Sequence, residues 1–135
     1  MKTMLAIMLG ALLCAGPASA NEIKVHRKYG IEYVTGGNDR AERLAMQALA
    51  PRFPAHLYFV LGGSDQVLTG VKVTVRDVSG DVVLEATSEG PLFYFSVDGG
   101  RYTVDAEYRG EKISMTKDLV GRRYLELEFK FKGGA

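Results

Sequence analysis

The chain has 135 residues, with 17 basic and 16 acidic side chains and a formal net charge of +1, so it offers no strong field for nucleic acid or an anionic membrane. Its one cysteine excludes a disulfide framework. A chain of this length can bury one core of ordinary size.

The first 20 residues have the pattern of a secretory signal peptide. Lys2 gives a positive start, and the mostly apolar run 4–15 is too short to span a bilayer of about 30 Å. Pro17 breaks the run, and Ala18-Ser19-Ala20 has the form of a cleavage site. Residues 1–20 therefore predict export.

Removal of 20 residues from 135 leaves a chain of 115 residues that starts at Asn21 and has no cysteine. Lipidation of Cys14 is disfavoured because the bulky Leu13 precedes it. We expect a periplasmic or secreted protein with no transmembrane segment after signal removal. We expect no nucleic-acid partner.

Residues 21–66 have a strand–helix–strand pattern. Short β-rich runs occur near 23–26, 31–34 and 56–61. Between the last two, Asn38 is the expected N-cap of a helix that ends before Pro51 and Pro54. The expected apolar stripe of this helix consists of Ala41, Leu44, Ala45, Ala48 and Leu49. We expect this segment to pack on the domain that follows.

Residues 67–135 alternate with a period of two, which indicates strands with one wet face. About six strands follow Gly70, with turn signals every 8–12 residues, and Ser79-Gly80-Asp81 predicts a tight hairpin turn. The nearly continuous apolar run 92–97 is typical of a strand buried on both faces. The sequence therefore predicts a mainly β protein, an antiparallel β-sandwich of immunoglobulin-like or transthyretin-like type with one amino-terminal helix.

The segment from Gly70 to Lys112 resembles the carboxypeptidase regulatory-like domain, a transthyretin-like or prealbumin-like β-sandwich. The similarity rests on the strand 70–77, on Gly80 and Gly90, and on Gly100-Arg101-Tyr102 opening the next strand. Asp98-Gly99-Gly100 stands where that family usually has a proline-proline-glycine turn. The resemblance covers about a third of the chain and implies a non-catalytic accessory or binding module in a small exported bacterial protein.

Tyr108-Arg109-Gly110 is similar to the Tyr-Arg-Gly-Ser ending of the transthyretin-like hydroxyisourate hydrolases. That enzyme site needs the tetrapeptide at the carboxyl end, together with two histidines and an arginine. Here Glu111 replaces the serine and the tripeptide lies well before the end of the chain. We interpret it as the end of a strand followed by a turn.

His26 and His56 are the only histidines, and a metal site could recruit them with Met46 or Met115. No pair has the spacing of metal ligands on a helix. Met46 lies beside the apolar stripe of the expected helix, and Met115 alternates with polar neighbours as a core residue should. The sequence therefore predicts no catalytic, cofactor or metal site, and whether His26 and His56 have a role stays open.

Other catalytic patterns are absent from the sequence. No Gly-x-Ser-x-Gly is present, and Gly63-Ser64-Asp65 is typical of a turn. Glu126 and Glu128 lie two apart on one strand, which predicts a solvated face. Gly36-Gly37-Asn38 opens a helix but lacks the glycine spacing of a phosphate-binding loop.

The sequence thus favours a non-enzymatic exported accessory or binding module whose partner is a protein or a cell-envelope component. Binding would use an open sheet edge or the aromatic strands. The alternative is a small-molecule or carbohydrate carrier with a cleft beside the amino-terminal helix, lined by Tyr29, Tyr33 and Tyr124.

Overall fold

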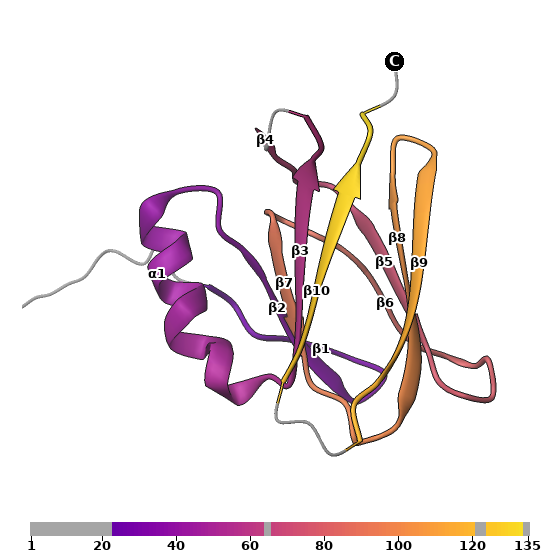
Figure 1. Cartoon of the computed structure of the whole chain (residues 1–135). Coiled ribbons are helices and arrows are strands. Elements are labelled where there is room, and N and C mark those ends of the chain that lie inside the picture. The colour runs from indigo at the N-terminus through magenta and orange to yellow at the C-terminus, as the bar shows by residue number, and fades with distance from the viewer. Residues whose placement is uncertain (1–22, 64–65, 121–123, 134–135) are drawn as a thin grey trace, which may run out of the picture.

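The computed structural model of the chain describes residues 23–63, 66–120 and 124–133. It is mainly β, with two packed sheets and one α-helix, so the predicted β-sandwich is confirmed (Figure 1). The predicted signal peptide over residues 1–20 lies outside the described residues.

A six-stranded sheet forms one layer, in the order β1-β2-β7-β3-β10, with β4 also paired to β3. Its strands are β1 (His26–Lys28), β2 (Ile31–Gly36), β3 (Ala55–Leu61), β4 (Gln66–Val67), β7 (Leu92–Phe95) and β10 (Leu125–Phe131). All pairs are antiparallel except β3 with β10, which run parallel. The parallel pair is a departure from the purely antiparallel sandwich that the sequence predicted.

A four-stranded antiparallel sheet forms the other layer, in the order β6-β5-β8-β9. Its strands are β5 (Lys72–Arg76), β6 (Val82–Thr87), β8 (Arg101–Tyr108) and β9 (Glu111–Asp118). β5 and β6 form the hairpin predicted at Ser79-Gly80-Asp81, and the carboxylate of Asp77 closes its turn by accepting from the backbone N–H groups of Ser79 and Asp81.

The main core lies between the two sheets and is filled by alternate residues of the strands, as their period of two requires. Its fully buried side chains include Phe59, Val73, Leu84, Phe93 and Phe129. β7 lies between β2 and β3 and is buried on both faces, because Phe93 and Phe95 enter this core and Tyr94 enters a second one. The sequence expectation for this strand is therefore confirmed.

The amino-terminal strands are part of the sandwich. The sequence pattern predicts a boundary at residue 66 between a strand–helix–strand segment and a sandwich domain, but β2 and β3 flank β7 within one sheet. β4 itself spans that boundary and pairs with β3. The period of two identifies a strand but not its neighbours, so the sequence could not assign these strands to the sheet.

The helix α1 (Arg40–Leu49) continues into the short 3-10 turn η2 (Ala50–Arg52) and covers part of the outer face of the six-stranded sheet (Figure 1). Its N-cap is Asp39 and not the predicted Asn38, since the Asp39 carboxylate accepts from the backbone N–H of Glu42 at 2.8 Å. Glu42 in turn accepts from the backbone N–H groups of Gly37 and Asn38 at 3.0 Å each, which forms a reciprocal cap.

The buried face of α1 differs from the predicted stripe. Met46 is fully buried against Val34 and Tyr94, whereas Leu44 is 53% exposed. The helix therefore turns the long Met46 side chain toward the sheet, because the small alanines of the predicted stripe could not fill the space over Val34 and Tyr94.

A close approach between two glycines fixes the crossover from β6 to β7. A side chain at Gly90 would collide with the backbone of Gly36 at the end of β2. Next to it, the hydroxyl of Thr35 accepts from the backbone N–H of Glu89 and donates to the carbonyl of Leu92. The close approach of Gly36 and Gly90 and the hydrogen bonds of Thr35 together hold the start of α1 beside the start of β7.

Candidate functional site

His56 lies in the middle of the only described cluster that combines a histidine, a carboxylate and several phenols. It is on β3, directly opposite Tyr94 of β7 and Glu126 of β10 in the sheet register. Tyr58 and Tyr124 complete this group, which we call the His56 cluster. Only 5% of the surface of His56 is exposed, because the end of the helix covers it.

Both ring nitrogens of His56 face acceptors. Nε2 lies 3.0 Å from the carbonyl oxygen of Ala50, at the carboxyl end of α1, so Nε2 carries a proton and donates. Nδ1 lies 3.6 Å from a carboxylate oxygen of Glu126. The ring also contacts the rings of Tyr94 and Tyr124, with centroids 4.3 and 5.5 Å apart.

Two phenols of the cluster, Tyr58 and Tyr94, have raised pKa values. Burial, and then the nearby Tyr58 and the Glu126 carboxylate, raise the pKa of Tyr94 to about 12. Burial also raises the pKa of Tyr58, followed by the charge of Glu126 and the hydrogen bond that Tyr58 donates to it. Tyr94 donates to Tyr58, so the hydroxyls form a chain that ends on the carboxylate.

This arrangement fastens three strands and the end of α1 together. The hydrogen-bond donors and acceptors of the cluster are paired with one another. Because Tyr58 and Tyr94 have raised pKa values, they stay protonated near neutral pH and do not act as bases there. Glu126 therefore has a cross-strand partner on a face that the sequence predicted to be simply solvated. No sequence pattern indicates this contact, because His56 and Glu126 are 70 positions apart in the numbering and meet only through the parallel pairing of β3 with β10.

His26 lies on the other face of the same sheet. Its ring stacks on Tyr33, with centroids 4.9 Å apart, and Tyr33 stacks on the core residue Phe93. The structure therefore does not bring His26 and His56 together. It places Arg101 in a pair with Asp118, with Nε and Oδ1 2.8 Å apart, at the far edge of the four-stranded sheet.

The sulfur atoms considered as metal ligands are in apolar surroundings. Met46 is buried between α1 and the sheet, and Met115 packs against the main core from β9. Among the described residues, no three side chains of the His, Cys, Asp or Glu type lie close enough together to hold a metal ion.

The Tyr-Arg-Gly tripeptide forms the turn between β8 and β9. Arg109 and Gly110 have φ of 49° and 85°, the pair of positive angles that a two-residue hairpin turn of type I′ requires. The guanidinium of Arg109 lies over the ring of Tyr108, 5.2 Å from its centroid. This placement agrees with the interpretation of a strand end and a turn.

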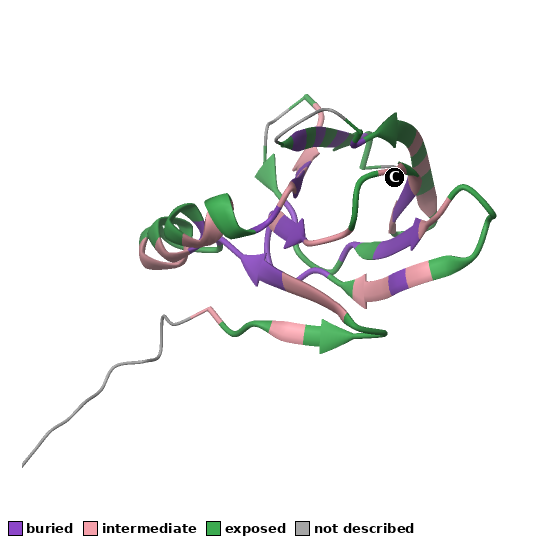
Figure 2. Cartoon of the chain, turned by 90° about the horizontal axis from the view of Figure 1, so that it is seen from below, coloured by how far each residue is buried: buried purple, intermediate pink, exposed green. Residues whose placement is uncertain are grey.

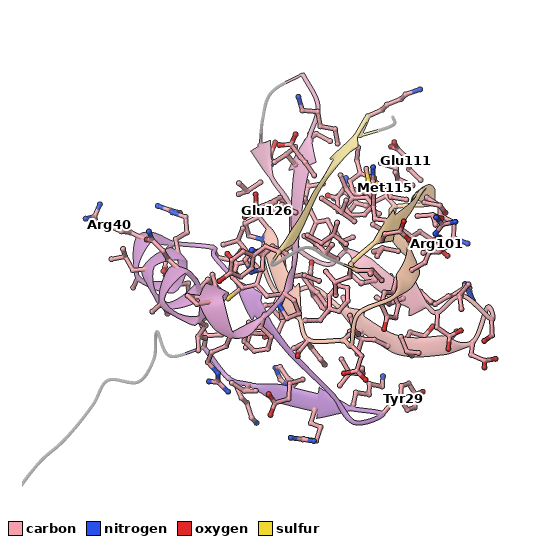
Figure 3. All side chains as sticks on the ribbon, turned by 60° about the horizontal axis from the view of Figure 1, so that its bottom comes forward. Tyr29, Arg40, Arg101, Glu111, Met115 and Glu126 are labelled. Carbon is pink, nitrogen blue, oxygen red and sulfur yellow. The ribbon has the colours of Figure 1, made fainter. Side chains whose placement is uncertain are left out.

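The three tyrosines that the carrier hypothesis requires are not gathered on one surface. Tyr29 is 67% exposed at the β1–β2 turn, Tyr33 faces the main core, and Tyr124 contacts His56 on the outer face. In Figure 3, Tyr29 lies well away from Glu126, the neighbour of His56.

The glycine pair before the helix leaves no exposed cradle for a phosphate. The carboxylate of Glu42 occupies the backbone N–H groups of Gly37 and Asn38, which a bound anion would use.

The outer face of the four-stranded sheet is polar, and neither of the helical segments that the structure describes covers it. Asp105 is only 6% exposed, since it accepts from the Ser114 hydroxyl at 2.5 Å and lies 3.6 Å from Nε of Arg76. On the same face, the hydroxyls of Thr103 and Thr116 are 2.8 Å apart. Sequence reasoning missed Asp105, because a carboxylate on a wet strand face gives no sign that its neighbours bury it.

One side of the sandwich is closed and the other is open (Figures 1 and 2). On the closed side, the carboxylate of Glu111 at the start of β9 accepts from the backbone N–H of Lys132, just after β10. On the other side lie β1 and β6, each paired with one strand only. We call the side formed by β1 and β6 the open side.

The comparisons with known proteins give no family. No protein-family model matches the chain, and no curated protein matches it either. In the part of the chain that the structure describes, no helix has the length and apolar character needed to cross a membrane.

Proposed function

We propose that this protein is an exported, non-enzymatic β-sandwich module that binds a protein or a cell-envelope component through strand addition. Export rests on the predicted signal peptide, and the accessory role rests on the resemblance to carboxypeptidase regulatory-like domains. The observation that carries the binding mode is the open side, where two strands end their sheets.

An edge strand presents unpaired backbone N–H and C=O groups, which can pair with an added strand. Proteins protect such edges with lysines, proline or very short strands. β9 has Lys112 and Lys117, and β1 has only three residues. β6 has six residues, no lysine and no proline, and its pairing with β5 is irregular only near its start, where Val82 is opposite Arg76 and Leu84 is opposite Val75. Its edge from Leu84 onward is therefore regular and carries none of these protections.

The same edge also exposes apolar surface. Val82 at the start of β6 is 42% exposed, and Val78 in the preceding turn is 79% exposed. An added strand would cover the first of these side chains and complete the backbone pairing of β6. The polar groups of the His56 cluster, by contrast, already have hydrogen-bond partners within the protein: Tyr94 donates to Tyr58, and His56 donates to Ala50. This supports a structural role for the cluster.

The test is a capture experiment with the chain immobilised and a periplasmic extract of the source cells. A Val82→Lys variant places a lysine on the β6 edge, and Val78→Lys adds the same charge at the hairpin turn. We expect one or more proteins to bind the unmodified chain and the Val78→Lys control, and to be lost with Val82→Lys. Recovery of no partner, or equal recovery with both variants, would contradict strand addition at β6.

A further inference from the structure

We infer that the open side joins two copies of this chain, with β1 of each copy added antiparallel to β6 of the other. This inference rests on the proposed binding through the open side and names the partner. It follows from three observations on the described residues: the direction of the two edge strands, their charges and the outward direction of Arg27 and Glu85.

The strand directions permit this pairing. β1 runs antiparallel to β10, as the successive pairings of the six-stranded sheet require. β10 ends where β9 begins, at the contact of Lys132 with Glu111, so these two strands also run in opposite directions. Because β6 is antiparallel to β9, β1 and β6 are antiparallel to each other within one chain.

Two symmetric edge-to-edge dimers are then possible. A two-fold axis parallel to the strands places β1 beside β6 of the second copy, and the two strands are antiparallel. A two-fold axis perpendicular to the sheets instead places β1 beside β1 and β6 beside β6. Both arrangements continue the sheets and the core, so the charges decide between them.

The two edges carry opposite charges. Residues 23–28, which include β1, contain Lys24, Arg27 and Lys28 and no acidic residue. Residues 81–89, which include β6, contain Asp81, Glu85 and Glu89 and no basic residue. Pairing of like edges would bring charges of one sign together, whereas pairing of β1 with β6 brings opposite charges together.

The outward directions of two side chains allow a specific contact. Arg27 faces outward opposite Glu32, to which its guanidinium bonds at 3.0 Å, and Glu85 faces outward 3.8 Å from Lys72. With Arg27 opposite Glu85 of the second copy, the outer face would carry Glu32, Arg27 and Glu85 in one row across the joint, and Lys72 would lie diagonal to Glu85. The signs in this row alternate, which favours cross-strand pairs.

The experiment measures the mass in solution by sedimentation equilibrium, using the chain expressed with all 135 residues shown, over a range of protein and salt concentrations. We expect a concentration-dependent dimer that weakens as salt rises. Glu85→Lys and Arg27→Glu should each raise the dimer dissociation constant by about tenfold or more, since each reverses a charge at both symmetric joints. Glu128→Lys, on the closed side at β10, is the matched control and should leave the dimer unchanged.

Mixing the two single variants gives the sharpest result. In a mixed pair, the lysine introduced at position 85 of one chain would meet the glutamate introduced at position 27 of the other, and the second joint would keep its native Arg27 and Glu85. The mixture should therefore form a dimer of near-native affinity although neither variant does alone. If Arg27→Glu fails to fold by circular dichroism, Lys28→Glu reverses the charge of the same edge.

A chain that stays monomeric at all concentrations would overturn the inference, as would a dimer that neither variant weakens or that mixing does not restore. The mass measurements can be distinguished from the outcome of the capture experiment, which tests the proposed binding function. A monomeric chain that loses another protein with Val82→Lys would leave the proposed binding function intact and would remove the second copy as the partner.

Discussion

The outer faces of the two sheets show how one alternating pattern can lead to two different surfaces. On the six-stranded sheet, Val34 and Tyr94 point outward, and Met46 of α1 covers them in a second apolar cluster. On the four-stranded sheet, Asp105 and Ser114 point outward, no helix or strand of the described residues covers them, and the Ser114 hydroxyl donates a hydrogen bond to the Asp105 carboxylate. The difference lies in whether the outward residues are apolar, since only an apolar face stabilises a covering helix.

The largest loss of stability should come from the outer face of the six-stranded sheet that α1 covers, which we call the covered face. Met46→Ala would leave a cavity between α1 and the sheet and should lower the free energy of unfolding by about 2–5 kcal/mol. The matched control on the same helix is Leu44→Ala, which should change it by about 0.5 kcal/mol or less because Leu44 is 53% exposed. Urea denaturation measures both; equal losses would mean that α1 packs through the stripe predicted from the sequence.

A smaller loss in the free energy of unfolding should follow removal of the most buried polar group on the outer face of the four-stranded sheet, which we call the bare face. Asp105→Ala leaves the Ser114 hydroxyl without its acceptor and Arg76 without its carboxylate, and should cost about 1–3 kcal/mol. Asp105→Asn keeps an acceptor for Ser114 and should cost less. If the midpoint of urea unfolding is the same for both variants as for the unmodified protein, the hydrogen-bond network on this face contributes nothing to stability.

The covered face should also respond to alkaline pH. The pKa of Tyr94 is about 12 in the folded protein and about 10 in the unfolded chain, so the unfolded chain loses its proton first. The stabilisation is fully present below pH 10 and is lost as the pH rises toward 12, with a slope of up to about 1.4 kcal/mol per pH unit.

This pH dependence can be assigned with Tyr94→Phe, which removes the phenol and keeps the ring against His56. We expect the decline in unfolding free energy between pH 10 and 12 to be shallower in the variant. Tyrosinate absorbance during a pH titration provides an independent check, since the phenol of Tyr94 should ionise only near pH 12 in the folded protein. An unchanged slope would show that Tyr94 is not the group responsible.

The smallest effect should come from the paired hydroxyls of the bare face. Thr103→Val removes one partner of the 2.8 Å contact with Thr116, and should cost about 0.5–1 kcal/mol. Replacing both threonines by valine should cost little more than the single change, since no hydroxyl is then left unpaired. A double-mutant cycle measures this coupling, and strictly additive losses would show that the two hydroxyls act independently.

Much of the strand content could be predicted because it depends on local patterns. The alternation of Val73 and Val75 in β5 and of Leu127 and Phe129 in β10 matches the residues that the core buries. The hairpin at Ser79-Gly80-Asp81 was predicted for the same reason, since turn chemistry acts over a few residues. The expectation for the helix was correct in place but wrong in its N-cap and its buried face.

The candidate site could not be predicted in the same way. His56 was identified as a candidate residue, yet its contacts with Ala50, Tyr94 and Glu126 come from three different elements. The open side was equally hidden, because Arg27 and Glu85 become edge residues only through the order of strands in each sheet.

The sequence by itself determined that the chain forms strands with one wet face and one helix, because side-chain period, capping and turn residues act over short distances. Only the tertiary structure decided that β2 and β3 flank β7, that β10 runs parallel to β3, and that β1 and β6 end their sheets on the same side. The reason is physical: backbone hydrogen bonds between strands are nearly the same for any partner, so the pairing is selected by packing of the complete core.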